Sequence, residues 1–485
     1  MRMRLTCLIA VCALVCLPPL SARSQSDTAL KLSTTVPQAV SEFRAGLVDL
    51  ENLSGEAAGS HFEAAVKADP NFGLARVLYV YAAGLLGGGL PQSQFDSELN
   101  RGVADAAARG NVNELLVAAA YREQTRGNTQ AAAAIARAAS QLLPGDRLIA
   151  VNAFGFPAFS SEQLTGLRDF IARNPSYALP YNTLAYSLWL QGDQTGALAA
   201  AKRQVELNPN APNPHDSYAE LLQWGGKFPE ASVEYRRATM TPPRFPEGYA
   251  GLAEVEALQG HYDQARAYLN QAIANAWSPQ QKLSYMRQIA GTYALQGNSS
   301  DAVTKQLDAI ASEAGVQQNP QRVAITQAQK ATVYATYGSP AAAHQAIAAA
   351  KAASPDTPWL VNYYATMAHA LMKHWAPANQ ELAALKAKAA TDPGVSKALI
   401  AAAEGNLATQ QGRPADALKI LMAADTTDIV VMNRIAEAHA ALGHPAVAKV
   451  WNDKVANNYA LNLADFPAAN ARRRSRLATS TLRTP

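Results

Sequence analysis

Three adjacent residues in the middle of the chain, His215, Asp216 and Ser217, are the residue types of a hydrolytic triad. In a working triad, the nucleophile, the base and the orienting acid converge in space. Adjacent residues on a helix point about 100° apart, so three consecutive helical side chains cannot meet one another. We therefore interpret this stretch as one turn of a structural helix and predict that it is not an active site.

The sequence also lacks the local signatures of common catalytic and cofactor-binding sites. It contains no G-x-S-x-G nucleophile elbow, no S-x-x-K pair, no H-E-x-x-H zinc motif and no G-x-x-x-x-G-K phosphate loop. We predict that the protein is not an enzyme, has no catalytic residues and binds no cofactor.

Two pairs of histidines raise the question of a metal site. His369 and His374 are five residues apart, and so are His439 and His444. Five steps along one continuous helix leave the two side chains of each pair roughly 140° apart. Two histidines that bind a metal from one helix face are usually four residues apart. We therefore predict no metal site at either pair.

The elements that would position any site follow an internal repeat. Gly192, Gly226 and Gly260 recur at equal intervals along the chain. Eight glycines each have an alanine five residues later and a small residue seven residues earlier: Gly127, Gly192, Gly226, Gly260, Gly297, Gly338, Gly412 and Gly443. Glycine tolerates the left-handed backbone that ends many helices, and the small residues let two helices approach closely. The pattern predicts pairs of amphipathic helices joined by short turns.

The clearest copies of the repeat lie between Ala178 and Glu247. Their fixed positions are Tyr181, Leu184, Ala185, Leu188, Gly192, Ala197 and Pro209 in the first copy, and Tyr218, Ala219, Leu222, Gly226, Ala231, Tyr235, Ala238 and Pro243 in the second. These residues resemble the tetratricopeptide repeat (TPR), a helix–turn–helix unit whose period matches the glycine interval. The resemblance covers roughly residues 35–459. It implies an all-α fold, a right-handed α-solenoid of stacked helix–turn–helix repeats, of the kind found in exported bacterial proteins.

The repeat divides the chain into segments. We expect a signal peptide at 1–24, a short linker at 25–34, degenerate repeats at 35–175, a well-matched core at 176–279, further repeats at 280–460 and a basic, disordered tail at 461–485. The wider glycine intervals on both sides of Gly297 predict longer loops there. The aromatic stretch from Ala153 to Ser161 interrupts the pattern, either as a corner that fills the core or as an exposed patch for a partner.

The N-terminus has the features of a secretory signal peptide. Arg2 and Arg4 precede an apolar run that is too short to span a membrane, and small residues before Gln25 allow cleavage. A lipid anchor on Cys16 is the alternative, although no small residue precedes that cysteine. All three cysteines lie in this segment, so the processed chain would have no disulfide and no thiolate ligand. We expect an exported protein, periplasmic or secreted, with no transmembrane segment after cleavage.

The net charge of the chain does not indicate that it binds nucleic acid. Its 42 basic and 38 acidic residues leave a net charge of +4, whereas nucleic-acid-binding proteins usually present a strongly basic face. Four arginines stand close together in the tail, at Arg472, Arg473, Arg474 and Arg476. We expect these arginines to be solvated, with contact to an anionic surface as the alternative.

The resemblance also implies where a partner would bind. In TPR proteins the first helix of each period lines the concave face, and the best-known type of groove clamps a C-terminal carboxylate with Lys, Arg and Asn side chains. The inward positions of this chain hold one amide, three aromatic residues and three acids: Asn182, Tyr186, Trp189, Asp216, Glu220, Trp224 and Glu254. Because acids stand where cations would be needed, we predict a protein or extended peptide with basic residues as the ligand. The alternative is a solvated acidic face above core tryptophans.

Three classes of function compete at this point. The first is an exported scaffold that binds a protein or peptide on the concave face of the solenoid. The second is an envelope-assembly or membrane-surface factor, which an acylated Cys16 or the arginine tail would favour. The third is an enzyme whose site is assembled from distant residues, and it would need a non-repeat domain that the sequence does not show.

Overall fold

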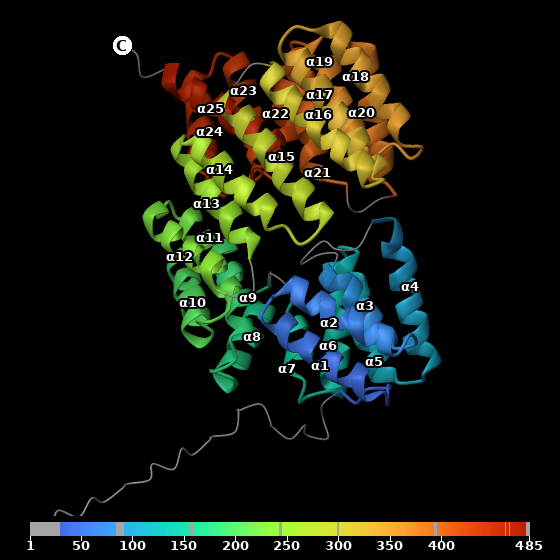
Figure 1. Ribbon diagram of the computed structural model, residues 1–485. Helices are drawn as coiled ribbons and strands as arrows, with labels where there is room; N and C mark the ends of the chain where they lie inside the picture. Colours follow the sequence, from blue (N-terminus) through green and yellow to red (C-terminus); the bar gives the residue numbers. More distant parts are fainter. Residues whose placement is uncertain are drawn as a thin grey trace, which may run out of the picture.

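The structure, a computed structural model, describes residues 30–83, 92–155, 160–241, 245–297, 300–391, 395–460, 462–464 and 466–481. Within these ranges the chain is helical and contains no strand (Figure 1). The proposed signal peptide, with Cys16, lies outside the described residues. The predicted fold class, an all-α solenoid of stacked helix pairs, is confirmed.

The helices follow one another with short connections. The first eight are α1 (Pro37–Glu51), α2 (Gly55–Ala68), α3 (Gly73–Tyr81), α4 (Gln92–Ala108), α5 (Val112–Thr125), α6 (Thr129–Leu142), α7 (Arg147–Asn152) and α8 (Ser161–Arg173). The next eight are α9 (Leu179–Leu190), α10 (Gln194–Leu207), α11 (Pro212–Trp224), α12 (Phe228–Met240), α13 (Pro246–Gln259), α14 (Tyr262–Ala274), α15 (Pro279–Gln296) and α16 (Ser300–Val316). The last nine are α17 (Pro320–Thr336), α18 (Pro340–Ala353), α19 (Trp359–Leu371), α20 (Trp375–Ala389), α21 (Lys397–Gln410), α22 (Pro414–Met422), α23 (Ile429–Ala441), α24 (Pro445–Ala456) and α25 (Phe466–Thr481).

The glycine register of the sequence corresponds to the turns between paired helices. All eight glycines of the repeat have a positive φ, between 73° and 87°. Lys373, with a φ of 58°, takes the same place between α19 and α20. The small residues around these turns are buried, for example Ala185, Ala197, Ala219 and Ala231. The sequence therefore located the helix–turn–helix units correctly.

The longer periods have longer helices rather than longer loops. The wider glycine intervals on both sides of Gly297 were predicted to add loop residues. The structure instead gives α15 18 residues, α16 17 residues and α17 17 residues. This prediction was wrong because extra residues of good helix propensity prolong a helix as readily as a loop.

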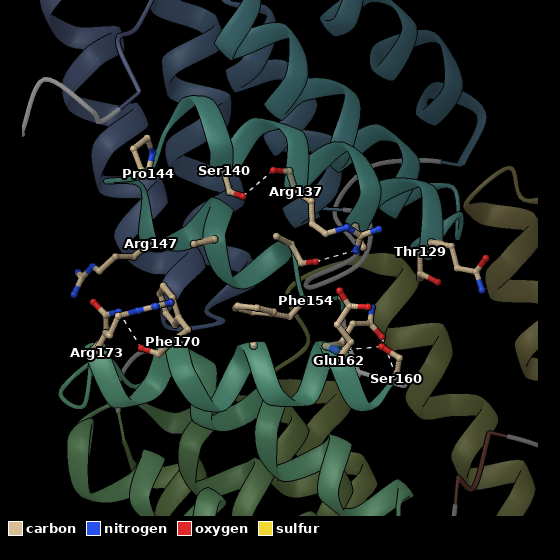
Figure 2. Close-up of a pocket in the computed structure, with 18 of the residues that line it drawn as sticks. Thr129, Arg137, Ser140, Pro144, Arg147, Phe154, Ser160, Glu162, Phe170 and Arg173 are labelled. Atoms are coloured by element: carbon tan, nitrogen blue, oxygen red, sulfur yellow. Dashed lines mark hydrogen bonds between the residues drawn. The ribbon is translucent and has the colours of Figure 1, made fainter.

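One consecutive pair does not pack together. Helices α7 and α8 lie apart, and a hollow of about 1350 Å³ opens between α6, α7 and α8 (Figure 2). Phe154 lies in this hollow with its ring centroid 5.9 Å from that of Phe170. Phe154 is half-buried, so it packs against the N-terminal core on one side and borders the open hollow on the other. Phe156 and Phe159 lie outside the described residues.

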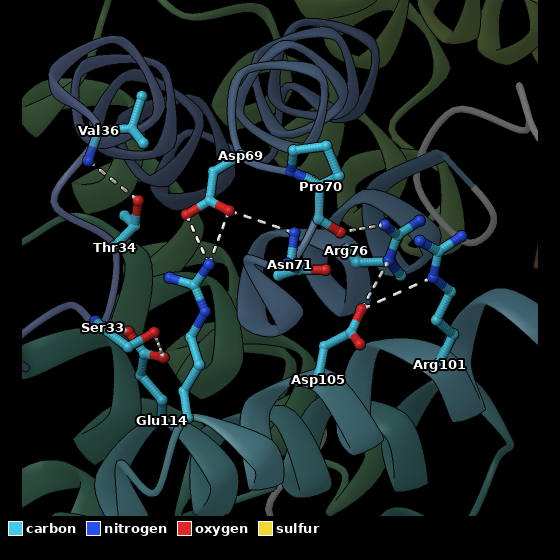
Figure 3. A network of polar contacts seen from close by, with 11 residues as sticks. Ser33, Thr34, Val36, Asp69, Pro70, Asn71, Arg76, Arg101, Asp105 and Glu114 are labelled. Atoms are coloured by element: carbon cyan, nitrogen blue, oxygen red, sulfur yellow. Dashed lines mark hydrogen bonds and ion pairs between the residues drawn. The ribbon is translucent and has the colours of Figure 1, made fainter.

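Hydrogen bonds and ion pairs of charged side chains stabilise the N-terminal end of the solenoid (Figure 3). Glu114 is fully buried and accepts hydrogen bonds from the Ser33 amide at 2.5 Å and the Ser33 hydroxyl at 2.6 Å. Arg109 donates to both carboxylate oxygens of Asp69, at 2.7 and 2.8 Å. Ser33, near the end of the predicted linker, is therefore held by α5, and Thr34 is buried next to Asp69.

The C-terminal segment is folded, and the prediction of a disordered tail is wrong. Residues 466–481 form α25, which packs against α15, α23 and α24 (Figure 1). The side chain of Arg472 is fully buried, and Arg474 donates to Asn433 and pairs with Glu437 at 2.9 Å. Apart from Phe466 at the start of the helix, the rest of the buried face is made of small residues, Ala468, Ala469, Ala471 and Ser475. Such a face has little hydrophobic signal in the sequence, yet it allows close packing against other helices.

A larger side chain at a buried alanine of the repeat should lower the free energy of unfolding by a measurable amount. Ala231 is fully buried between α11 and α12, so Ala231→Leu should lower the free energy of unfolding by about 1–3 kcal/mol. Val233, on the same helix, is 45% exposed, and Val233→Leu is the matched control, with an expected change within about 0.5 kcal/mol. Urea denaturation of both variants measures the effect. Equal stability of Ala231→Leu and wild type would contradict the packing register.

No helix in the described ranges has the length and the apolar composition that a membrane span requires.

Candidate functional site

The three residues of the apparent triad have separate structural partners. His215 is buried, with Nδ1 2.7 Å from Glu234 Oε2 and Nε2 3.0 Å from the carbonyl oxygen of Pro209. Ser217 accepts a hydrogen bond from the Asn182 amide at 3.0 Å. Asp216 lines a cavity instead. The side chains diverge, as the helical interpretation predicted.

The concave face is built from columns of residues that are one period apart. Tyr186, Glu220 and Glu254 are successive members of one column, on α9, α11 and α13. The hydroxyl of Tyr186 donates to Glu220. Asn213, Glu247 and Gln281 form a second column, in which the Gln281 amide donates to Glu247 at 2.7 Å. The regular period of the repeat thus brings polar side chains from successive helix pairs into contact.

A cavity of about 470 Å³ lies where these columns meet the N-terminal repeats. The chain curls back, so that Asn52 accepts a hydrogen bond from Asn208 at 2.7 Å. Helices α1 to α7 supply one wall, with Leu50, Tyr81, Tyr121 and Asn152. Helices α9 to α13 supply the other, with Asn182, Tyr186, Asp216, Glu220 and Glu247. No described residue that lines the cavity carries a positive charge.

The acids of this region resist ionisation. Burial raises the pKa of Glu247 to about 7. Burial also raises the pKa of Asp216 well above its usual value, and repulsion from Glu220 and Glu247 adds to the effect. The pKa of Glu220 is raised by burial too, although the hydrogen bond from Tyr186 opposes the shift. Three carboxyl groups on one cavity wall therefore lack the cation that would stabilise their charged forms.

The predicted tryptophans lie next to this cavity rather than in its wall. The ring of Trp224 lies 5.8 Å from that of Tyr186 and 5.8 Å from that of Trp189, measured between centroids. Both tryptophans are half-buried and pack in the core formed by α9, α10 and α11. They support the wall that carries Tyr186.

Glu254, the last predicted groove residue, faces the C-terminal segment. It accepts a hydrogen bond from the Gln223 amide at 3.3 Å, and the same amide donates to the carbonyl oxygen of Tyr459 at 3.3 Å. Burial raises the pKa of Glu254 to about 8, while the positive charge of Arg472 acts in the opposite direction. This part of the concave face is thus covered by the chain itself.

The segment around Leu463 completes that cover. The ring of Tyr459 lies 5.2 Å from that of Phe228 in an edge-to-face arrangement. Arg287 donates to the carbonyl oxygen of Ala464 at 3.0 Å, and Arg476 donates to that of Leu258 at 3.0 Å. A basic segment from the end of the chain therefore lies on the concave face of the middle repeats.

The structure brings together four of the predicted groove residues, Asn182, Tyr186, Asp216 and Glu220, in one cavity. Glu254 does not line this cavity, although its charge still acts on Asp216, and the cavity adds Glu247, which the sequence reasoning missed. The signal for Glu247 was its position seven residues before Glu254, which is two turns along the same helix face. The wall from α1 to α7 had no such signal, because only the curvature of the solenoid brings it near.

The histidine pairs are closer together than the helical argument predicted. Helix α19 ends between His369 and His374, and the amide of His374 donates to the carbonyl oxygen of His369 at 2.9 Å. The chain therefore reverses between the two residues, and their ring centroids are 6.3 Å apart. His439 and His444 flank the equivalent turn at Gly443, with ring centroids 5.8 Å apart. The predicted divergence of each pair was wrong because it assumed one continuous helix.

Comparison with known proteins gives distant similarities only. No family model matches the sequence, and no curated protein matches it. YrrB, a TPR protein described as having an unusual peptide-binding site, is 19% identical, with 40% of this chain and 95% of YrrB covered and a TM-score of 0.26. Yeast Tom70 is 12% identical, with 92% and 96% covered and a TM-score of 0.40. A chain of the APC/C hetero-tetramer Cut9–Hcn1 is 11% identical, with 90% and 96% covered and a TM-score of 0.31. The helical-repeat fold of this chain is evident from its own helix pairs and glycine turns.

Proposed function

We propose that this chain is a non-catalytic scaffold that binds an extended, basic segment of a partner protein in the cavity between α1–α7 and α9–α13. The observation that carries the proposal is the set of three carboxyl groups, Asp216, Glu220 and Glu247, in a cavity wall without a described basic residue. A bound Lys or Arg side chain would supply the missing positive charge and stabilise the ionised acids.

The lining of the cavity suits a basic peptide rather than a small anion. Tyr81, Tyr121 and Phe245 offer aromatic surface for the apolar parts of a ligand. Glu247 Oε2 is buried and has no hydrogen-bond partner among the described residues, so no described donor stabilises a negative charge on it. An anion such as a C-terminal carboxylate would find no cation in the described lining and would be repelled by the acids in their ionised forms.

The C-terminal segment offers an intramolecular parallel. It covers the neighbouring part of the concave face, where the positive charge of Arg472 acts on Glu254. The repeats of this chain thus already hold one segment that combines arginines with small residues. A partner segment of similar composition would use the same chemistry in the adjoining cavity.

The proposed scaffold acts outside the cytoplasm, in the periplasm or as a secreted protein. The basic start, the short apolar run and the small residues before Gln25 support this location. N-terminal sequencing of the exported protein should give a chain that starts near Gln25. Recovery of the full chain with Met1 from the cytoplasm would contradict the location and leave the binding proposal untouched.

Peptide binding tests the cavity directly. Fluorescein-labelled dodecapeptides of equal length, with four Lys or Arg residues or with none, should differ in affinity, the basic peptides binding more tightly. The double variant Asp216→Asn/Glu247→Gln should weaken binding of the basic peptides at least tenfold, about 1.4 kcal/mol, because it removes two acids from the wall. Fluorescence anisotropy at pH 8 measures the difference.

The matched control removes two acids elsewhere. Asp169 and Glu230 are exposed and do not line the cavity, so Asp169→Asn/Glu230→Gln lowers the net negative charge equally. Its affinity for basic peptides should stay within twofold of wild type. Equal losses in the two double variants would show that binding follows overall charge, and the proposed site would be rejected.

A further inference from the structure

Three histidines from two successive helix pairs meet in the C-terminal repeats, near the turn between α19 and α20. His344 is the fifth residue of α18, His369 lies in the last turn of α19, and His374 precedes α20. His344 Nε2 lies 3.1 Å from His374 Nδ1, and their rings stack at 5.0 Å with an angle of 17°. The ring of His369 lies 5.7 Å from that of His344. One ring nitrogen from each residue falls within 4.8 Å of the other two.

This arrangement fits the coordination of a transition-metal ion. Zinc binds imidazole nitrogens at about 2.0–2.1 Å, which places two tetrahedral ligands about 3.4 Å apart. The separation of 3.1 Å between His344 and His374 is close to that value. Because His344 is exposed and His374 is half-buried, their rings can adjust toward the third nitrogen. Imidazole is a preferred ligand of zinc, copper and nickel.

The buried member of the cluster is suited to act as a ligand. His369 is 7% exposed, and its Nδ1 has no hydrogen-bond partner among the described residues. An imidazole nitrogen without a hydrogen-bond partner keeps its lone pair available for a metal ion.

Glu381 is already occupied by other residues. It pairs with Lys351 and accepts a hydrogen bond from the Asn362 amide at 2.8 Å. The carboxylate of Glu381 therefore balances the positive charge of Lys351. In the part of the chain that the structure describes, the cluster of His344, His369 and His374 is the only place where three metal-binding side chains of the His, Cys, Asp or Glu type converge.

We propose that His344, His369 and His374 bind one divalent transition-metal ion of the zinc type through three imidazole nitrogens, with the remaining coordination position open to water. The ion would connect α18 to the turn between α19 and α20 and so join two successive helix pairs. The site is far from the acidic cavity in the chain and is independent of the function proposed for it.

The chain offers a matched control in its second histidine pair. His439 and His444 have Nδ1 atoms 3.5 Å apart at the equivalent turn. His344 stands six residues after Gly338, the turn glycine of the helix pair before His369 and His374. In the helix pair before His439 and His444, the position six residues after the turn glycine, Gly412, is Leu418. The second pair therefore has two imidazoles where the proposed site has three.

Titration of the full chain with Zn²⁺ alone, after removal of any affinity tag, tests the proposal. Wild type should bind one Zn²⁺ per chain by isothermal titration calorimetry, and Zn²⁺ should raise its melting temperature. His344→Ala should weaken binding at least tenfold, with the metal-free melting temperature unchanged because His344 is exposed. His444→Ala should retain the wild-type affinity. With Cu²⁺, electron paramagnetic resonance should show coupling to three nitrogens in wild type and to two in His344→Ala.

Each contrary result rejects the site. Absence of Zn²⁺ binding by wild type, full affinity in His344→Ala, or an equal loss in His444→Ala would each overturn the proposal. A copper spectrum that is the same in wild type and His344→Ala would do so as well.

Discussion

Replacing Gly291 with alanine should displace the C-terminal segment from the solenoid. A β-carbon at position 291 would lie 1.8 Å from the carbonyl oxygen of Leu463, so the backbone of one segment has to move. We expect the free energy of unfolding to fall by about 1–3 kcal/mol or more, as for other overpacked cores. Limited proteolysis should cut between α24 and α25 much faster than in wild type.

A second glycine in a neighbouring helix provides the control. Gly315 lies in α16, is exposed, and would place its β-carbon more than 4 Å from any other group. Gly315→Ala should therefore keep the proteolysis pattern and gain up to about 1 kcal/mol, because alanine favours helix. If Gly291→Ala is as stable and as protease-resistant as wild type, the C-terminal segment does not pack on α15 in solution.

Stability should decrease as the pH rises from about 4.5 to about 8. The folded protein raises the pKa of Glu247 from 4.5 to about 7 and that of Glu254 from 4.5 to about 8, both mainly by burial. Over this range the folded state keeps protons that the unfolded state has lost. The unfolded state then binds fewer protons, so the free energy of unfolding falls with increasing pH and levels off above the folded pKa values.

The expected size of this loss is about 2–3 kcal/mol for the two groups together. A change of one in a pKa corresponds to about 1.36 kcal/mol, and both side chains keep some contact with solvent, which reduces the effect. Urea denaturation at several pH values measures the slope. Glu254→Gln should reduce the slope between pH 6 and 8, whereas Glu230→Gln, on the exposed face of α12, should leave it unchanged. The same slope in wild type and Glu254→Gln would contradict the raised pKa.

The sequence by itself determined the local structure of the repeat. Glycine at eight equivalent positions, with small residues at fixed distances, specified where each helix ends and where two helices approach. These features depend on the backbone freedom of glycine and on side-chain size, which act over a few residues. The same register placed Tyr186 and Glu220 one period apart on the concave face, and their hydrogen bond follows from that spacing.

Only the tertiary structure determined which residues far apart in the sequence come close together in space. The wall of the cavity from α1 to α7, the seat of α25 and the approach of His344 to His374 all depend on the curvature of the solenoid and on reversals of the chain. Curvature accumulates from small rotations at every helix pair, so no single stretch of sequence reveals it. The burial of Arg472 shows the same limit, because a run of arginines looks solvated until other helices surround its small-residue face.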